Sequence, residues 1–265
     1  MNTSSTTLLI LLRGVAFRAT GRGQWSSSYE SLAEQMSALR SITTFVLHPA
    51  TRAKWHAVIA ADVVVPKQLE ALWYNATAAL STPLAAQRLS PRHLGHSQVA
   101  SIASSIRWSV SLLQTAGTLL LLRVDLVLKA EVPACLVGHC QNVRVPFDLI
   151  ECDDDNMAFR ALSDAILWIP AAAFAPFDSM LLRGNHQGHS LHSMHMETGL
   201  ETVDVMLPGF QGDTNTDADW NPLFYIIGRE HATLQAREEK LHMNPNMYSC
   251  NSSKHAFRAA QKRLV

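Results

Sequence analysis

The chain has few charged residues and no long apolar segment, and both shortages narrow what it can do. Only 17% of its 265 residues are charged, and 22 Lys and Arg balance 22 Asp and Glu. A protein without a basic excess lacks the electrostatic footprint of a nucleic-acid-binding protein. No apolar run reaches the roughly 18 residues that a transmembrane helix needs. We therefore expect no nucleic-acid partner and no transmembrane segment in this chain.

The N-terminus and the cysteines place fewer limits on the class of protein and its compartment. The first apolar run, residues 8–12, is short and has no basic residue before it, so it does not fit a secretory signal peptide. The protein is then either cytoplasmic or belongs in the Golgi or another secretory lumen, with a targeting segment missing from this sequence. Cys135 and Cys140 do not have the close spacing of a zinc finger. The sequence is compatible with a disulfide between these two cysteines and with two free thiols.

Several catalytic signatures are also absent. The chain has no Gly-x-Ser-x-Gly elbow and no His-Glu-x-x-His motif, which argues against the hydrolases that use them. Histidine does recur at every third position, at His186, His189, His192 and His195. Two histidines three apart on a helix can ligate zinc. Without the signature we interpret the run as a loop or surface cluster, and a metal-dependent hydrolase stays a third possibility for the chain.

What the chain does contain is an alternation of short apolar runs and amphipathic stretches, which is typical of α/β proteins. Strands are expected at 8–12, 43–47, 57–65, 118–129, 143–150, 165–169 and 203–207, and helices at 28–39, 67–80, 97–115 and 171–182. The segment between Pro83 and Pro91 reads as a polar loop. We predict one open, mostly parallel but mixed sheet flanked by helices, spanning residues 1–229. A C-terminal helix and a loose tail are expected over residues 230–265.

The most informative segment is the expected strand at 118–129. Four leucines are followed by Arg123 and Asp125, after which the apolar run resumes. In a strand these two side chains point to the same side. Because a buried charge is unfavourable unless it is paired or bound, this strand is predicted to end at an ion pair, a metal or a ligand. Ligands of open α/β sheets bind beyond the carboxyl ends of the strands, where a carboxylate can hold a cation and an arginine can contact phosphate.

The order of elements around this strand resembles that of nucleotide-sugar glycosyltransferases of the GT-A fold. The resemblance lies in the run Leu-Leu-Arg-Val-Asp-Leu-Val after a helix, in Arg160 with Ser163-Asp164-Ala165-Ile166, and in the segment from Asn221-Pro222 to Gly228-Arg229. Some of these enzymes carry an Arg-x-Asp version of their Asp-x-Asp metal motif. The resemblance implies transfer of a sugar from a nucleoside diphosphate donor to a hydroxyl group of a glycan or other acceptor. Arg123 replaces the first Asp of the motif, which puts metal dependence in doubt.

The resemblance also implies roles for particular residues. Asp125 would hold a divalent cation, Mn²⁺ or Mg²⁺, or the donor ribose, and Arg123 would contact phosphate. Arg13 and Arg18, which precede a Gly-rich segment at 21–24, are expected to help bind the donor. Asp164 would be a catalytic carboxylate facing the acceptor. His192 and His195 are further candidates for contact with the diphosphate.

Each of these readings has a simpler alternative. Asp153 and Asp155 have the Asp-x-Asp spacing after a predicted strand, which makes them a rival metal site, but they also fit a solvated acidic turn before a helix. Asp164 could pair with Arg160 four residues earlier or act as a cap. The Arg123–Asp125 pair could be purely structural. The alternative function is a non-catalytic, glycosyltransferase-like binding or scaffold domain that has lost the metal motif.

Overall fold

The computed structural model of the chain describes residues 7–18, 27–90, 98–112, 117–132, 142–146, 149–152, 158–161, 165–187, 203–205 and 223–227. The strands are β1 (Thr7–Val15), β2 (His56–Val64), β3 (Leu84–Ser90), β4 (Thr118–Arg123), β5 (Leu126–Leu128), β6 (Val143–Val145), β7 (Leu149–Cys152), β8 (Ala158–Ala161), β9 (Ile166–Ile169), β10 (Val203–Val205) and β11 (Phe224–Ile226). The helices are α1 (Tyr29–Ile42), α2 (His48–Arg52), α3 (Glu70–Thr77), α4 (Gln98–Val110) and α5 (Phe174–Gln187), with short π- or 3₁₀-helical turns η1 (Thr43–Leu47), η2 (Lys67–Leu69) and η3 (Ala171–Ala173).

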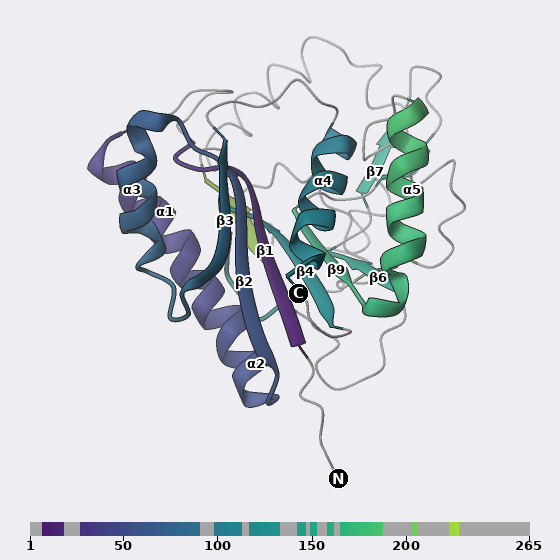
Figure 1. Cartoon of the computed structure of the whole chain (residues 1–265), viewed down its shortest axis with the longest axis horizontal. Coiled ribbons are helices and arrows are strands. Elements are labelled where there is room, and N and C mark those ends of the chain that lie inside the picture. The colour runs from purple at the N-terminus through teal and green to yellow at the C-terminus, as the bar shows by residue number, and fades with distance from the viewer. Residues whose placement is uncertain are drawn as a thin grey trace, which may run out of the picture.

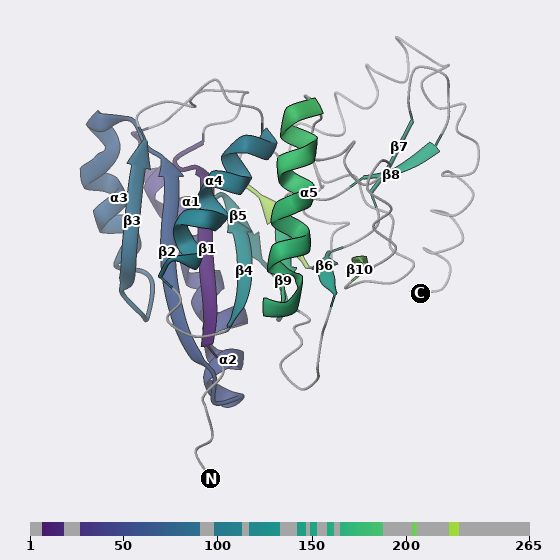
Figure 2. The ribbon, with the colours of Figure 1, turned by 45° about the vertical axis from the view of Figure 1, so that its right-hand side comes forward.

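Seven of these strands form one mixed sheet, in the order β10-β6-β9-β4-β1-β2-β3 (Figures 1 and 2). Strand β9 runs antiparallel to its neighbours β4 and β6, whereas the other neighbouring pairs are parallel. Two antiparallel pairs, β5 with β11 and β7 with β8, lie outside this sheet. The predicted fold class, an open and mostly parallel sheet flanked by helices, is confirmed.

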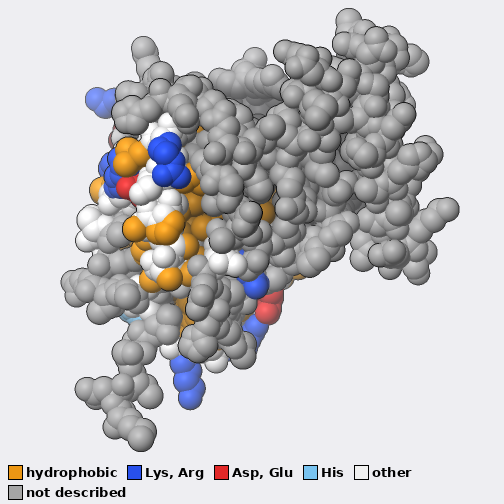
Figure 3. Space-filling model, turned by 90° about the vertical axis from the view of Figure 1, so that its right-hand side faces the viewer, with side chains coloured by type: hydrophobic (Ala, Val, Ile, Leu, Met, Phe, Trp, Pro, Cys, Tyr) orange, Lys and Arg blue, Asp and Glu red, His pale blue; other side chains and the backbone are white. Residues whose placement is uncertain are grey.

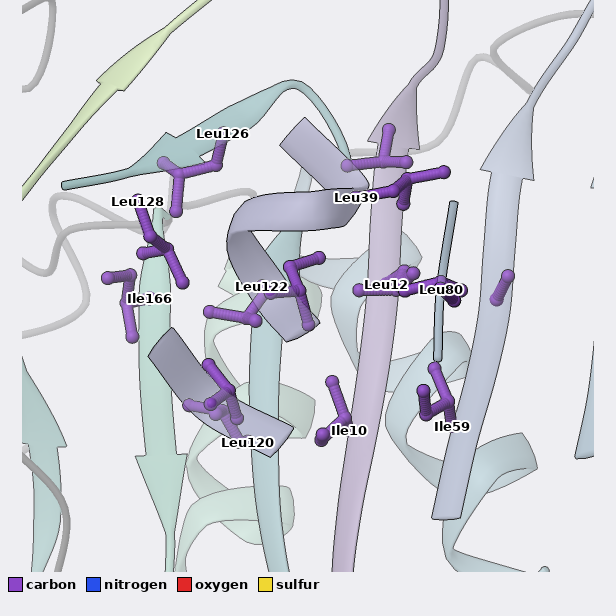
Figure 4. Packing of buried hydrophobic residues seen from close by; sticks show 14 of the residues in the cluster. Ile10, Leu12, Leu39, Ile59, Leu80, Leu120, Leu122, Leu126, Leu128 and Ile166 are labelled. Carbon is purple, nitrogen blue, oxygen red and sulfur yellow. The ribbon is translucent and has the colours of Figure 1, made fainter. Parts of the chain in front are cut away.

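Helices cover the sheet on both faces. Helices α1, α2 and α3 lie on one face, and α4 and α5 lie on the other (Figure 1). Alternate residues of β1 and β4 therefore enter different cores. Leu12 and Leu122 pack with Leu39 of α1 (Figure 4), whereas Leu11 and Leu121 belong to the cluster that contains residues of α4 and α5. Burial on both faces explains why these strands read as continuous apolar runs instead of alternating ones.

The expected strand at residues 43–47 is wrong, because this segment is the π-helical turn η1 and joins α1 to α2. Its composition, with two threonines, Phe45 and Val46, favours a strand, but a short apolar run cannot be told from a buried helical segment by periodicity alone. Val46 and Leu47 are buried in the core beside the sheet. Residues 29–52 thus form one helical connection between β1 and β2.

The loop expected after Pro83 is also wrong, because residues 84–90 form β3 at the edge of the sheet. None of its side chains is fully buried, although Leu84 and Leu89 pack against the core, and backbone pairing with β2 also holds the strand. The expected strand at 118–129 is two strands. The chain turns at Val124 and Asp125, and β5 then leaves the main sheet to pair with β11.

The expected strand at 143–150 is likewise divided between β6 and β7. The helix expected after Asp155 is wrong, because residues 158–161 form the strand β8, which pairs with β7. The other expected helices and strands are present, with shifted ends. The predicted C-terminal helix and tail lie outside the described residues. Within the part of the chain that the structure describes, no helix is both long enough and apolar enough to span a membrane.

Candidate functional site

The candidate site lies where the strand order of the sheet reverses. The chain steps outward from β1 to β2 and β3, and α4 then carries it back to β4 on the other side of β1. Open α/β sheets bind their ligands beyond the carboxyl ends of the strands at such a reversal. Arg13 of β1 and Arg123 of β4 are direct register partners near these ends. The edge concerned is the upper edge of the sheet in Figure 2.

These two arginines belong to a row of charged side chains that crosses four strands. Arg13 is also opposite Asp62 of β2, and Asp62 is opposite Arg88 of β3. Direct partners in parallel strands point to the same face of a sheet. That face is the one covered by α4 and α5, because Leu11 and Leu121, two residues earlier, pack on that side. We call Arg88, Asp62, Arg13 and Arg123 the charged row.

Arg123 and Asp125 form a two-pronged ion pair at one end of this row. Arg123 donates from Nε to Oδ1 of Asp125 at 2.9 Å and from Nη2 to Oδ2 at 2.8 Å. Nη1 of Arg18 lies 3.5 Å from the same Oδ2. Only 1% of the Asp125 side chain is exposed. The predicted need of this strand end for charge partners is thus met by Arg123 and Arg18, while the functional roles of all three residues stay predictions.

Backbone hydrogen bonds from three distant segments fix the turn that carries Asp125. The amide of Val124 donates to the carbonyl of Arg13 at 2.8 Å, and that of Arg123 donates to Ala165 at 3.1 Å. The carbonyl of Asp125 accepts from the amide of Ile227 at 2.9 Å. Strand β1, the start of β9 and the end of β11 therefore hold this turn in place.

Gln35 of α1 is a residue of the site that sequence reasoning missed. Its side chain is 1% exposed, and its Nε2 donates to the carbonyl of Val124 at 2.7 Å. Its Oε1 accepts from the amide of Phe17 at 3.0 Å. An amide can donate and accept at once, so one side chain links the end of β1 to the turn after β4. The available signal was a polar residue beside the apolar stripe of a core helix.

The backbone that leads to Arg18 has an unusual conformation. Gly14 has φ of 113° and Phe17 has φ of 54°, in the left-handed region that residues with a side chain rarely adopt. Phe17 is nonetheless 1% exposed and bonded to Gln35. Such a conformation persists only where its surroundings hold it, and it often occurs at binding sites. The backbone between β1 and Arg18 is therefore constrained, which helps to fix the position of Arg18 beside Asp125.

Helix α4 supplies the polar partners of the rest of the charged row. Ser101 Oγ lies 3.5 Å from Nη2 of Arg13, and Ser105 Oγ lies 2.6 Å from Oδ2 of Asp62. Arg88 pairs with the same Asp62 oxygen, and its guanidinium carbon lies 4.5 Å from the ring centre of Trp108. The helix thus contacts the row at three of its four members.

A hollow of about 440 Å³ adjoins the β3 end of the row. It is lined by Arg88, Ala100, Ala103, Ser104, Arg107, Trp108, Leu181 and Leu182. Figure 3 looks onto the right-hand side of the ribbon in Figure 1, and on its described part hydrophobic side chains lie among basic ones. The two basic groups of the hollow already have acidic partners, since Arg88 pairs with Asp62 and Arg107 with Asp178. At the Arg123 end, by contrast, Arg123 and Arg18 share the single carboxylate of Asp125, so this hollow is the weaker candidate for an anion.

The residues around Asp125 do not suit a divalent cation. Both carboxylate oxygens already accept from a guanidinium group, and a cation bound there would lie next to two positive charges. Among the described residues, no three His, Cys, Asp or Glu side chains come together as metal ligands. The rival metal residues Asp153 and Asp155 lie outside the described residues and stay predictions. Asp164, Cys135, Cys140, His189, His192 and His195 also lie outside them, and His186 is in α5.

No protein-family model matches the sequence, and no curated protein matches it either. Solved structures do resemble it. The glycosyltransferase GlyE of Streptococcus pneumoniae is 11% identical with a TM-score of 0.42, over 80% of this chain and 48% of its own. This chain thus spans about half of GlyE.

Two further solved structures resemble this chain to a similar degree. The galactosyltransferase LgtC, in complex with donor and acceptor sugar analogs, is 13% identical with a TM-score of 0.40, over 74% of this chain and 72% of its own. HddC of Yersinia pseudotuberculosis, in complex with GMP-PN, is 7% identical with a TM-score of 0.44, over 88% of this chain and 99% of its own. The similar structures include nucleotide-sugar glycosyltransferases, as the sequence predicted, and at these identities the likeness concerns the fold alone.

Proposed function

We propose that the chain transfers a sugar from a nucleoside diphosphate donor to a hydroxyl acceptor. The observation that supports this most is the position of Arg13 and Arg123, side by side where the strand order reverses. Nucleotides bind at such reversals in open α/β sheets. Guanidinium groups match phosphate oxygens with paired N–H donors. In this proposal Arg13, Arg18 and Arg123 bind the phosphates of the donor.

The remaining roles follow from this orientation. The nucleoside and the sugar would extend along the carboxyl edge on either side of the diphosphate. Asp164, which immediately precedes the described start of the segment leading into β9, is proposed as the carboxylate that faces the acceptor hydroxyl. A carboxylate in hydrogen-bond reach of that hydroxyl can accept its proton as it attacks the sugar.

The second candidate is a domain that binds a nucleotide or its sugar without turnover. The observation that favours it is the enclosure of Asp125 by Arg123 and Arg18. A transferase that neutralises its leaving group with a cation needs an accessible carboxylate for that ion. If the chain has no substitute for the cation, donor binding survives but transfer does not.

Calorimetric titration with UDP, GDP, CDP and ADP tests the proposal. We expect one of them to bind and its affinity to fall tenfold or more in Arg13→Gln. Arg52→Gln is the matched control, because Arg52 forms a surface pair with Glu131 away from the sheet edge. Absence of nucleotide binding would contradict both candidate functions.

Donor turnover then separates the two candidates. The matching nucleotide sugars are incubated with the protein and mixed hydroxyl acceptors, and release of the nucleoside diphosphate is measured. Release that disappears in Asp164→Asn supports the transferase. Tight binding without release in the wild-type protein supports the binding domain.

A further inference from the structure

We infer that this chain holds the diphosphate of its ligand with guanidinium groups alone, in place of a divalent cation at Asp125. This inference rests on the proposed function, since it concerns how the same site binds phosphate. It assigns Asp125 a positioning role for Arg123, and it makes Arg18 and Arg123, together with Arg13, the groups that meet the ligand.

Exposure orders the side chains of Asp125, Arg123 and Arg18 from the inside outward. The exposed fraction is 1% for Asp125, 12% for Arg123 and 19% for Arg18. The carboxylate therefore lies behind the two guanidinium groups. A ligand that arrives from solvent meets positive charge first, which attracts phosphate and repels a divalent cation.

The contact geometry leads to the same conclusion. A carboxylate oxygen binds Mg²⁺ at about 2.0–2.1 Å. Oδ1 and Oδ2 of Asp125 already lie 2.9 Å and 2.8 Å from nitrogens of Arg123. A cation on either oxygen would therefore lie beside at least one guanidinium group, and the two positive charges would repel each other at short range in a buried setting. Binding the cation would thus weaken the pairing of Asp125 with Arg123 and Arg18.

The surroundings of the Arg123–Asp125 pair explain what fixes the orientation of Arg123. The turn after β4 is held by Arg13, Gln35 and Ile227, so the Asp125 carboxylate has a fixed position. Two parallel hydrogen bonds from a rigid planar group then fix the orientation of Arg123 as well. A guanidinium group that is ordered before binding loses less conformational entropy when phosphate arrives.

Arg18 is the group most able to change partner. Its 3.5 Å contact with Asp125 is the longest of the three, and its side chain is the most exposed. A diphosphate bound beside Arg123 would draw Arg18 away from the carboxylate, while the two bonds of Arg123 remain. Replacing Arg18 should therefore lower the affinity for the ligand without breaking the buried pair of Arg123 and Asp125.

The test uses the whole chain and two probes, inorganic pyrophosphate and the nucleoside diphosphate that binds best, each titrated in EDTA and in Mn²⁺. We expect the Kd of each probe to agree within threefold between the two conditions. We expect Arg18→Gln to weaken both probes tenfold or more in EDTA and to flatten the dependence of Kd on salt. Arg18→Lys should recover part of the loss, and Arg52→Gln should change neither value.

The outcomes distinguish this inference from the proposed function. Nucleotide binding that requires Mn²⁺ overturns the inference and leaves the function standing, and Asp153→Asn with Asp155→Asn then shows whether those residues hold the ion. Pyrophosphate that binds in EDTA through Arg18, without any nucleotide binding, supports guanidinium binding and contradicts the function. Equal affinity of Arg18→Gln and wild type for pyrophosphate overturns the inference.

Discussion

Two arginine–aspartate pairs occupy the same edge of the sheet, and they differ in their access to water. Arg88 and Asp62 join the edge strand β3 to β2, with side chains 38% and 18% exposed. Arg123 and Asp125 close the central strand β4, with side chains 12% and 1% exposed. Water and salt screen the first pair and hardly reach the second.

The difference in burial gives the two pairs different physical roles. An exposed ion pair contributes little to stability, because water solvates both partners when they separate. A buried pair contributes little as a unit too, yet removing one partner leaves a charge that nothing solvates. We call Arg88 with Asp62 the outer pair and Arg123 with Asp125 the inner pair. Losing one member of the outer pair should hardly affect stability, whereas losing one member of the inner pair leaves its buried partner without a counter-charge.

The largest effect is expected for Asp125→Asn. The substitution keeps the shape of the side chain but leaves Arg123 and Arg18 facing a neutral amide in a buried position. We expect the free energy of unfolding to fall by about 3–5 kcal/mol. Denaturant titration followed by circular dichroism measures it.

A double variant shows whether the charge or the space is responsible. Arg123→Met with Asp125→Leu removes both members of the inner pair and keeps apolar volume. It should recover a large part of the stability lost in Asp125→Asn. A double variant that is less stable than Asp125→Asn would show that the pair is favourable as a unit, against the comparison made above.

An intermediate effect is expected for Gln35→Met, which removes the link between β1 and the turn after β4. The amide of Phe17 and the carbonyl of Val124 would both be buried without their side-chain partner. We expect a loss of about 2–3 kcal/mol, near the lower limit for two buried backbone groups that each cost about 1–3 kcal/mol when left unsatisfied. If Arg123 is aimed through this turn, pyrophosphate affinity falls as well, which a purely structural role would not cause.

The smallest effect is expected for Asp62→Asn in the outer pair. Asp62 and Arg88 are both reached by water, so the change in the free energy of unfolding should be about 1 kcal/mol or less. Arg52→Gln, in a still more exposed pair, provides the reference for no effect. A loss in Asp62→Asn that equals that of Asp125→Asn would remove the distinction between the two pairs.

The sequence indicated the inner pair because its signal is local. A strand period and two charges inside an apolar run are enough to place Arg123 and Asp125 on one side. Arg13 and Arg18 were also proposed from sequence, although nothing local showed that Arg13 is the register partner of Arg123. That relation depends on the strand order, which only the fold establishes.

The missed features have the opposite character, because their surroundings determine them. Residues 43–47 have the composition of a strand but continue a helix whose face packs on the sheet. Strand β3 has apolar residues that are only partly buried, and it depends on backbone pairing with β2 as well as on their packing. Gln35 looks like an ordinary helix residue until the two backbone groups that it bridges come together from distant parts of the chain.

The hydrogen bond from Ile227 to Asp125 has a consequence for biosynthesis. The ribosome makes β1 to β4 first, and domains begin to fold while later residues are still being added. The segment that closes the turn at Asp125, however, is made only after β9, α5 and β10. The nascent sheet can therefore assemble with its inner ion pair still incompletely held, and the turn at Asp125 is completed only when the late strand β11 docks on β5.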